Sequence, residues 1–177
     1  MDLGKRIMIM GSSGSGKSTI ATKLGELLNL PVVHLDKLRF LPGWEAISAT
    51  DLEQKVKAAA DQGEWIIDGN HLETRDYRLE RADTVVFLDF SRYICLLRTI
   101  KRRVKWHGKS RPSVAEGCPE KLDGELVKLI IWSYPKSWRK DTIKWLAKVE
   151  PPKQVYHLKG NKAVKHFLRE VHASVKE

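Results

Sequence analysis

The sequence predicts a three-layer α/β fold with a five-stranded parallel β-sheet flanked by helices. Two observations predict it. Five short apolar runs of the buried-strand type are spaced along the 177 residues, at 7–10, 31–35, 64–68, 84–89 and 154–158. Segments with apolar residues at helical spacing lie between most of them, and strands that alternate with helices form parallel sheets with right-handed crossovers.

Length and composition limit the architecture and the setting. A chain of 177 residues suffices for one domain, so we expect a single domain over residues 1–177. With 42% hydrophobic and 31% charged residues, and no apolar run of roughly 18 residues or secretory leader, we expect neither a membrane span nor a membrane partner. The two cysteines, Cys95 and Cys118, are too few for a disulfide framework, which favours the cytoplasm.

The first predicted strand leads directly into a glycine-rich loop. Its residues are Gly11, Ser12, Ser13, Gly14, Ser15, Gly16, Lys17, Ser18 and Thr19, which fit the pattern G-x-x-x-x-G-K-[ST]. Glycines let backbone N–H groups surround phosphate oxygens where a Cβ would clash. We therefore expect residues 11–19 to bind the phosphates of ATP within a P-loop NTPase fold. The alternative, a flexible Ser/Gly linker, rarely carries Lys-Ser at this offset between a strand and an amphipathic helix.

Three side chains have specific expected roles in this phosphate site. Lys17 would reach the β- and γ-phosphates, and the Ser18 hydroxyl would ligate Mg²⁺ at the start of a helix whose dipole favours anions. Asp68 ends the third predicted strand, where the aspartate of other phosphate-loop enzymes holds the hydration shell of Mg²⁺. An aspartate that only supports the turn before Gly69 is the alternative.

Asp36 follows the second predicted strand. In open α/β sheets ligands gather at the carboxyl ends of strands, so this carboxylate is expected to meet a substrate hydroxyl or the metal shell. A turn-capping aspartate is the alternative. In the next segment, Phe40 and Trp44 either line an acceptor pocket or cover the core.

Residues 92–111 carry the strongest charge bias in the chain, with eight basic side chains and no acid. On a helix over about 93–106, Arg98 and Arg102 share one face and can clamp phosphoryl oxygens. The apolar side chains expected to face inward are Ile94, Leu97, Ile100 and Val104. Together with the Gly/Pro-rich segment after it, this stretch predicts a lid over about 98–124. A solvated basic face followed by a disordered loop is the alternative.

The C-terminal third is predicted to be helical, with a break at Pro135, before the fifth strand and a last helix that begins at Asn161. We expect its tryptophans to pack in the core, since large aromatic side chains mainly serve burial. The six histidines show no metal-ligand spacing, so none is assigned to a metal.

The whole chain resembles adenylate-kinase-like P-loop kinases, and specifically the group labelled DNA topology modulation proteins (FlaR-related). The motifs that carry the resemblance are His34-Leu35-Asp36, Pro42-Gly43-Trp44, Trp65-Ile66-Ile67-Asp68-Gly69-Asn70, Asp76-Tyr77-Arg78-Leu79, and Arg111-Pro112 with Glu116-Gly117-Cys118-Pro119. In addition, Arg98-Thr99-Ile100-Lys101-Arg102-Arg103 is similar to the Arg-x-x-x-Arg-Arg at the start of the adenylate kinase lid.

The resemblance implies roles for particular residues. Arg98 would flank the adenine ring and phosphates of ATP, and Arg102 the phosphoryl group in transfer. The turn that begins with Lys159 would lie by the base. In adenylate kinases the Asp-Gly that corresponds to Asp68-Gly69 is followed by Phe-Pro-Arg, whose arginine grips the acceptor phosphate. In this chain Asn70-His71-Leu72 follows instead. Arg39, Arg75 and Arg78 are candidate substitutes. With a hydroxyl acceptor, Asp36 would orient the hydroxyl or take its proton.

These expectations add up to an ATP- and Mg²⁺-dependent phosphotransferase with a small acceptor. Lys17, Asp36, Arg98 and Arg102 are its expected catalytic residues. The net charge of +10 favours anionic ligands in general. This charge and the label of the resembled group favour a nucleotide-regulated nucleic-acid-binding protein as one alternative, and a simple NTPase is a second.

Overall fold

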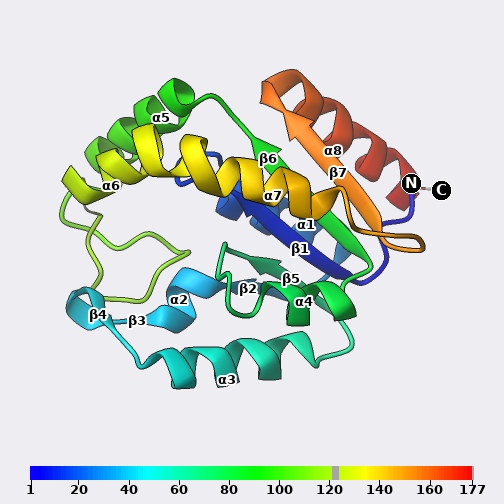
Figure 1. The fold of residues 1–177 in the computed structure, drawn as a ribbon, viewed down its shortest axis with the longest axis horizontal. Coiled ribbons are helices and arrows are strands. Elements are labelled where there is room, and N and C mark those ends of the chain that lie inside the picture. Colours follow the sequence, from blue (N-terminus) through cyan, green and yellow to red (C-terminus); the bar gives the residue numbers. More distant parts are fainter. Residues whose placement is uncertain (121–123, 177) are drawn as a thin grey trace.

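The computed structural model describes residues 1–120 and 124–176 and contains the predicted sheet (Figure 1). Five parallel strands lie in the order β2-β5-β1-β6-β7. Their bounds are β1 Arg6–Gly11, β2 Val32–His34, β5 Trp65–Asp68, β6 Thr84–Asp89 and β7 Gln154–Lys159. The predicted three-layer α/β class with five parallel strands is confirmed.

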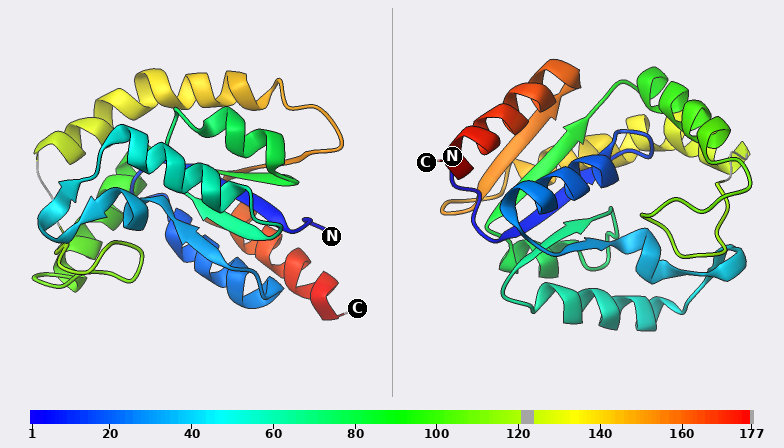
Figure 2. Two further views of the ribbon diagram at one scale, coloured as in Figure 1. Left: turned by 90° about the horizontal axis from the view of Figure 1, so that it is seen from below. Right: turned by 180° about the vertical axis from the view of Figure 1, so that it is seen from behind.

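The central strand β1 is buried on both faces, because its side chains alternate between two cores. Ile7 and Ile9 pack with helices α1 (Lys17–Leu28) and α8 (Gly160–Lys176). Met8 and Met10 pack on the other face with α3 (Ala49–Ala60), next to α4 (Arg75–Arg81). The two further views show these helix layers on opposite sides of the sheet (Figure 2). The strands therefore read as apolar runs rather than as alternating sequences.

A short hairpin follows β2. It consists of α2 (Leu35–Arg39), β3 (Phe40–Leu41), the 3₁₀ turn η1 (Pro42–Trp44) and β4 (Glu45–Ala46), with β3 and β4 antiparallel. Asp36 lies in the first turn of α2, directly after the strand.

The C-terminal helical part differs from its prediction. Helix α6 (Gly124–Lys128), the π-helical segment η2 (Leu129–Trp138) and α7 (Arg139–Leu146) follow one another without interruption, so the predicted break at Pro135 is wrong. In a π-helix the hydrogen bonds join residues five apart, and this wider turn accommodates the proline. The expected burial of the tryptophans also fails for Trp132 and Trp138, whose side chains are exposed.

Helix α5 (Arg92–Lys105) is turned the opposite way from its prediction. The apolar residues expected inside are all exposed, namely Ile94, Leu97, Ile100 and Val104. Cys95 and Thr99 are fully buried instead, because this face of α5 lies directly against the glycine-rich loop of residues 11–19, which we name the phosphate loop after its expected role. Of the helices in the described ranges, none combines the length and apolar character needed to cross a bilayer.

Candidate functional site

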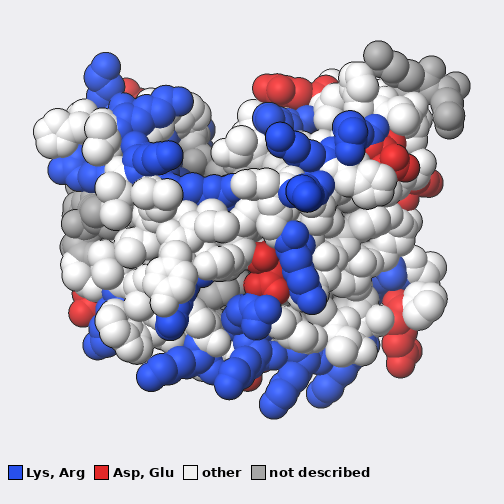
Figure 3. Space-filling model, turned by 90° about the horizontal axis from the view of Figure 1, so that it is seen from above, with Lys and Arg blue, Asp and Glu red and all other residues white. Residues whose placement is uncertain are grey.

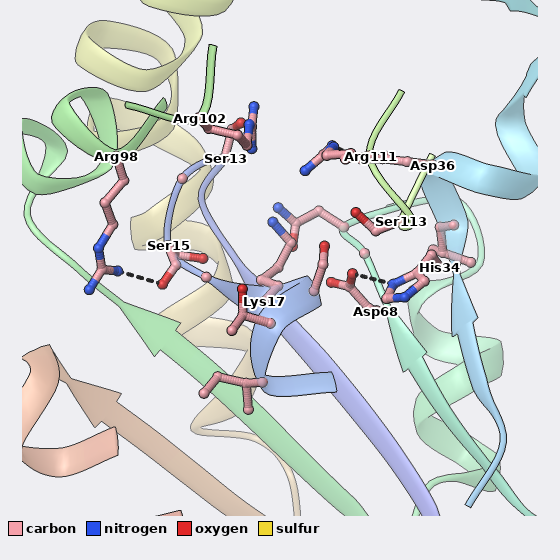
Figure 4. A pocket seen from close by; sticks show the side chains of 18 of the residues that line it. Ser13, Ser15, Lys17, His34, Asp36, Asp68, Arg98, Arg102, Arg111 and Ser113 are labelled. Atoms are coloured by element: carbon pink, nitrogen blue, oxygen red, sulfur yellow. Dashed lines mark hydrogen bonds and ion pairs between the residues drawn. The ribbon is translucent and has the colours of Figure 1, made fainter. Parts of the chain in front are cut away.

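The predicted site residues from Ser13 to Thr19, together with Asp36, Asp68, Arg98 and Arg102, line a cavity of about 1240 Å³ at the carboxyl ends of the central strands. Gly11, Ser12 and Lys159 do not line it. Figure 4 shows side chains from the phosphate loop, α5, the loop after α5 and the ends of β2 and β5 gathered around one space. The cavity runs from Asn161 at the start of α8 to Phe40 and Trp44 in the hairpin. It extends well beyond the phosphate loop in both directions.

The phosphate loop connects β1 to α1 in a conformation that depends on glycine. Gly14 has a φ of 77° and Gly16 a φ of 98°, both in the left-handed region. A Cβ on Gly14 would lie 2.2 Å from the carbonyl oxygen of Cys95, so only glycine lets α5 approach the loop this closely. Lys17 begins α1, and its Nζ donates to the Ser12 carbonyl oxygen at 3.1 Å.

Asn70 holds the start of this loop. Its Oδ1 accepts a hydrogen bond of 3.0 Å from the Gly11 N–H, and its Nδ2 donates one of 2.6 Å to the Gly11 carbonyl. In the sequence, Asn70 ends one of the resemblance motifs and begins the departure from adenylate kinases, but neither observation assigned it a role. The two bonds explain its presence, because a side-chain amide pairs with a backbone amide in the same way as a neighbouring strand does.

Asp68 lies at the end of β5, buried beside the loop. His34 Nδ1 at the end of β2 is 2.9 Å from its Oδ2. Burial alone would raise the pKa of Asp68, but the contact with His34, the charge of Lys17 and the hydroxyl of Ser18 together hold that pKa below its usual value. The carboxylate is therefore ionised at neutral pH. Its Oδ1 has no hydrogen-bond partner within residues 1–120 and 124–176.

The Asp68 carboxylate is ionised, lies next to the Ser18 hydroxyl and has one oxygen without a hydrogen-bond partner among the described residues. These properties fit a magnesium ion that is held mainly through water and phosphate oxygens. No cluster of three or more His, Cys, Asp or Glu side chains suited to a metal occurs in the described ranges. Mg²⁺ does not require such a cluster, because in nucleotide sites one or two protein ligands suffice.

Two arginines of α5 reach the cavity from the opposite side. Arg98 Nη1 donates to the Ser15 carbonyl oxygen at 2.8 Å (Figure 4). Its Nη2 donates to Asn161 Oδ1 at 2.6 Å. The guanidinium also lies over the ring of Phe90, 4.3 Å from its centroid. Arg98 thus joins the phosphate loop to the start of α8. One turn along the helix, Arg102 faces the cavity as well.

Glu120 neutralises Arg102 and connects it to the loop after α5. Its Oε1 accepts from Arg102 Nε at 2.6 Å, and its Oε2 lies 3.3 Å from Arg111 Nε. Arg111 in turn donates from Nη2 to Asp36 Oδ2 at 3.1 Å. The Glu120 side chain is only 2% exposed, whereas that of Asp36 is 52% exposed. Two acids and two arginines therefore alternate along one wall of the cavity. Sequence reasoning did not select Glu120, although it directly follows the motif Glu116-Gly117-Cys118-Pro119, because nothing in the sequence shows its proximity to Arg102.

The described part of the predicted lid lies against the hairpin. Gly43 N donates to the Gly117 carbonyl at 2.8 Å, and Trp44 Nε1 donates to that of Pro119 at 2.7 Å. Residues 121–123, which the predicted lid includes, lie outside the described residues. The segment with Phe40 and Trp44 and the loop after α5 are separate in the sequence, but in the structure they form one wall of the cavity. Phe40 and Trp44 pack edge to face within it, with ring centroids 5.1 Å apart.

The three candidate acceptor-gripping arginines have different surroundings. Arg39 lines the cavity. Arg75 stacks on Trp145, 4.5 Å from the centroid of the contacted ring. Arg78 is fully buried, and its guanidinium donates to backbone carbonyls at positions 69, 71 and 74. Burial lowers the pKa of Arg78 to about 10, so it stays charged at neutral pH and holds the turn after β5 together.

Lys159, expected near the base, ends β7 and lines a second cavity of about 380 Å³ behind the loop. Ser12 lines that cavity too, together with Asp89 at the end of β6. Arg139 donates to Asp89 through Nε and Nη2, at 2.7 and 2.8 Å, and His157 Nε2 lies 2.7 Å from Asp89 Oδ2. Asn161, two residues after Lys159, is the part of this turn that lines the main cavity.

Comparison with known proteins reveals similarity of fold. Neither a protein-family model nor a curated protein matches the sequence. Among solved structures, a gluconokinase from Sinorhizobium meliloti 1021 is similar with a TM-score of 0.56 at 18% identity, over 99% of this chain and 94% of that one. A shikimate kinase from Acinetobacter baumannii, solved with shikimate, has a TM-score of 0.52 at 13% identity, over 97% and 93%. A deoxyadenosine kinase from M. mycoides has a TM-score of 0.50 at 15% identity, over 96% and 98%. At these identities the likeness concerns the fold alone.

Proposed function

We propose that this chain is an ATP- and Mg²⁺-dependent phosphotransferase that acts on a small acceptor molecule. The observation that carries the proposal is the extent of the main cavity. From the phosphate loop it continues toward Asn161 on one side and toward His34, Asp36 and Phe40 on the other. A site that bound only a nucleotide would not need the part of the cavity near His34, Asp36 and Phe40. The kinase names of the structural neighbours above agree with this proposal.

The parts of the site divide by their chemistry. The loop amides and Lys17 would bind the phosphates of ATP, with Asn161 and Arg98 at the side of the base. Ser18 and Asp68 would hold Mg²⁺, which, when bound, neutralises phosphate charge. Lys17 and Arg102 would offset the charge that develops on the phosphoryl group during transfer. Asp36 would orient an acceptor hydroxyl once Arg111 releases it.

The wall formed by the hairpin and the loop after α5 would act as the lid. Closing it would exclude water that otherwise hydrolyses ATP. Because Arg102 and Arg111 are linked through Glu120, movement of the loop would bring both guanidiniums toward the transferring group together. The two buried, unpaired cysteines suit a reducing compartment, and we propose a cytoplasmic location on that ground.

The test is acceptor-dependent release of ADP. Purified protein with ATP and Mg²⁺ is screened against nucleoside monophosphates, nucleosides and small hydroxy acids and sugars. A specific acceptor should raise ADP release at least about tenfold above hydrolysis in water, since transfer requires stabilisation of the transition state. Hydrolysis that no acceptor enhances would indicate an NTPase instead. Salt-dependent DNA binding without turnover would indicate the nucleic-acid alternative.

A further inference from the structure

The side of α5 that faces away from the domain is apolar. Tyr93, Leu97, Ile100 and Val104 lie on it at intervals of four, three and four residues. Tyr93 is 65% exposed and Val104 is 74% exposed. Surface helices normally present polar side chains on this side. The 4-3-4 spacing is that of the a and d positions along a coiled-coil seam. We name these four residues the α5 seam.

The α5 seam lies on a helix that is fixed in place by its opposite face. The opposite face of α5 is fixed to the domain, with Cys95 and Thr99 completely buried next to Gly14. In Figure 1 and in the view from behind in Figure 2, α5 lies at the edge of the molecule. A partner can therefore reach the helix from the outer side only. A rigid helix costs less conformational entropy on binding than one that must fold first.

The charges beside the seam define what can bind. In the heptad set by the seam, Lys101 takes an e position and Arg103 a g position, where charged pairs select the partner of a coiled coil. All six charged residues of α5 are basic, and Lys and Arg predominate on the face of the molecule that includes it (Figure 3). A second copy of α5 would bring like charges together. The seam also offers only a few hundred Å², roughly, against about 800 Å² per partner in a standard interface.

We propose that the α5 seam is a docking site for an acidic amphipathic helix of a partner protein. The partner helix would place apolar side chains at its a and d positions against the seam. It would place Glu or Asp at the e and g positions that face Lys101 and Arg103. Four apolar contacts and two peripheral ion pairs make a small interface, so the association would be weak and reversible.

Two synthetic peptides test the proposal on the intact protein. Both are three-heptad amphipathic helices with Leu at a and d; one has Glu at every e and g position and the other has Lys there. Fluorescence anisotropy should show at least about tenfold tighter binding of the Glu peptide. In Lys101→Glu/Arg103→Glu the preference should reverse toward the Lys peptide. Equal binding of the two peptides, or a preference unchanged by the charge reversal, would overturn the proposal.

A matched pair of valine substitutions tests the position. Val104→Asp places a carboxylate in the proposed interface, so the affinity for the Glu peptide should fall by at least about tenfold. Val175→Asp makes the same change on α8, where Val175 is 50% exposed, and should bind as the wild type does. Equal loss in both variants overturns the assignment to α5. Light scattering that shows a wild-type dimer dissociated by Val104→Asp would assign the seam to a second copy. Binding to anionic vesicles but to neither peptide would assign it to lipid.

Discussion

Glu120 accepts a hydrogen bond of 2.6 Å from Nε of Arg102, across 18 positions of sequence and at the wall of the main cavity. The carboxylate is buried, and without it Arg102 would face Arg111 with no acid between them. Burial, and then the proximity of Arg111, lower the pKa of Arg102, while Glu120 opposes this. We interpret Glu120 as a positioning residue that keeps the two guanidiniums in one place.

This interpretation predicts the behaviour of Glu120→Gln. The amide keeps the shape but loses the charge that holds both arginines, and hydrogen bonds to charged groups contribute about 1.5–3 kcal/mol. We expect kcat for phosphoryl transfer to fall about tenfold or more, with KM for ATP changed much less. Glu116→Gln, an exposed acid in the same loop, is the control and should act as wild type. If KM for ATP rises while kcat is kept, Glu120 serves nucleotide binding instead.

Lys17→Ala should weaken ATP·Mg binding and remove turnover while leaving the fold intact. The ammonium of Lys17 contacts the Ser12 carbonyl within the loop, so its loss removes charge from the phosphate site and little packing. Calorimetry should show ATP·Mg affinity reduced by at least about tenfold, as expected for a lost ionic contact to phosphate. Lys23→Ala, an exposed lysine further along α1, should bind ATP normally. Wild-type affinity in Lys17→Ala would refute the phosphate-loop assignment.

Asp68 and Asp36 should separate by role. In Asp68→Asn a neutral amide replaces the ionised carboxylate beside Ser18, so activity should need a much higher Mg²⁺ concentration. Asp36→Asn should lower kcat for transfer and leave ATP binding nearly unchanged, because Asp36 lies on the acceptor side with Arg111. Magnesium titrations of activity and calorimetry with ATP distinguish the two. Equal loss of ATP affinity in both variants would contradict this division.

The position of the glycine-rich loop between a strand and a helix could be predicted from the sequence, because its pattern spans eight consecutive residues, 11–18. The contacts that hold it could not. Asn70 binds Gly11 across 59 positions, and Glu120 reaches Arg102 from the far end of a loop. Only the fold brings such pairs together, and one sequence carries no signal of their proximity.

The orientation of α5 could not be predicted for a different reason. Its amphipathic pattern correctly indicates two unlike faces, but periodicity does not say which face is buried. The apolar face of an amphipathic helix is normally expected to be the buried one. Here the close approach of Gly14 to the Cys95 carbonyl fixes the other face against the domain. Tertiary packing therefore overrides the local pattern.

The lowered pKa of Asp89 leads us to expect a measurable pH dependence of stability. Burial alone would raise its pKa, but Arg139 and His157 outweigh burial and hold that pKa below its usual value of 3.8. The unfolded chain therefore binds more protons near that pH, so the stabilisation is fully present above about pH 4 and is lost as pH falls through the folded-state pKa. Asp89→Asn should cost about 1–3 kcal/mol of unfolding free energy at pH 7. Urea titrations should show the gap to wild type narrowing below about pH 4, and a gap that stays constant down to pH 3 would contradict the assignment.

Gly14→Ala should destabilise the protein and displace α5. Gly14 has a φ of 77°, and an added Cβ would lie 2.2 Å from the backbone oxygen of Cys95 and 2.6 Å from Thr99 Oγ1. Backbone atoms cannot rotate away as a side chain can, so the helix must move. Strain and overpacking each cost about 1–3 kcal/mol, and in a chain of this size each kcal/mol lowers Tm by about 2–4 °C.

The same substitution at Gly63 provides the control, because a Cβ there meets no atom within 4 Å and its φ lies outside the left-handed region. Gly63→Ala should keep the wild-type Tm within about a degree, as expected for a surface change of a few tenths of a kcal/mol. Since α5 carries Arg98 and Arg102, Gly14→Ala should also lose transfer activity at temperatures where it remains folded. A Gly14→Ala protein with wild-type Tm and activity would show that the contact between α5 and the phosphate loop is not required.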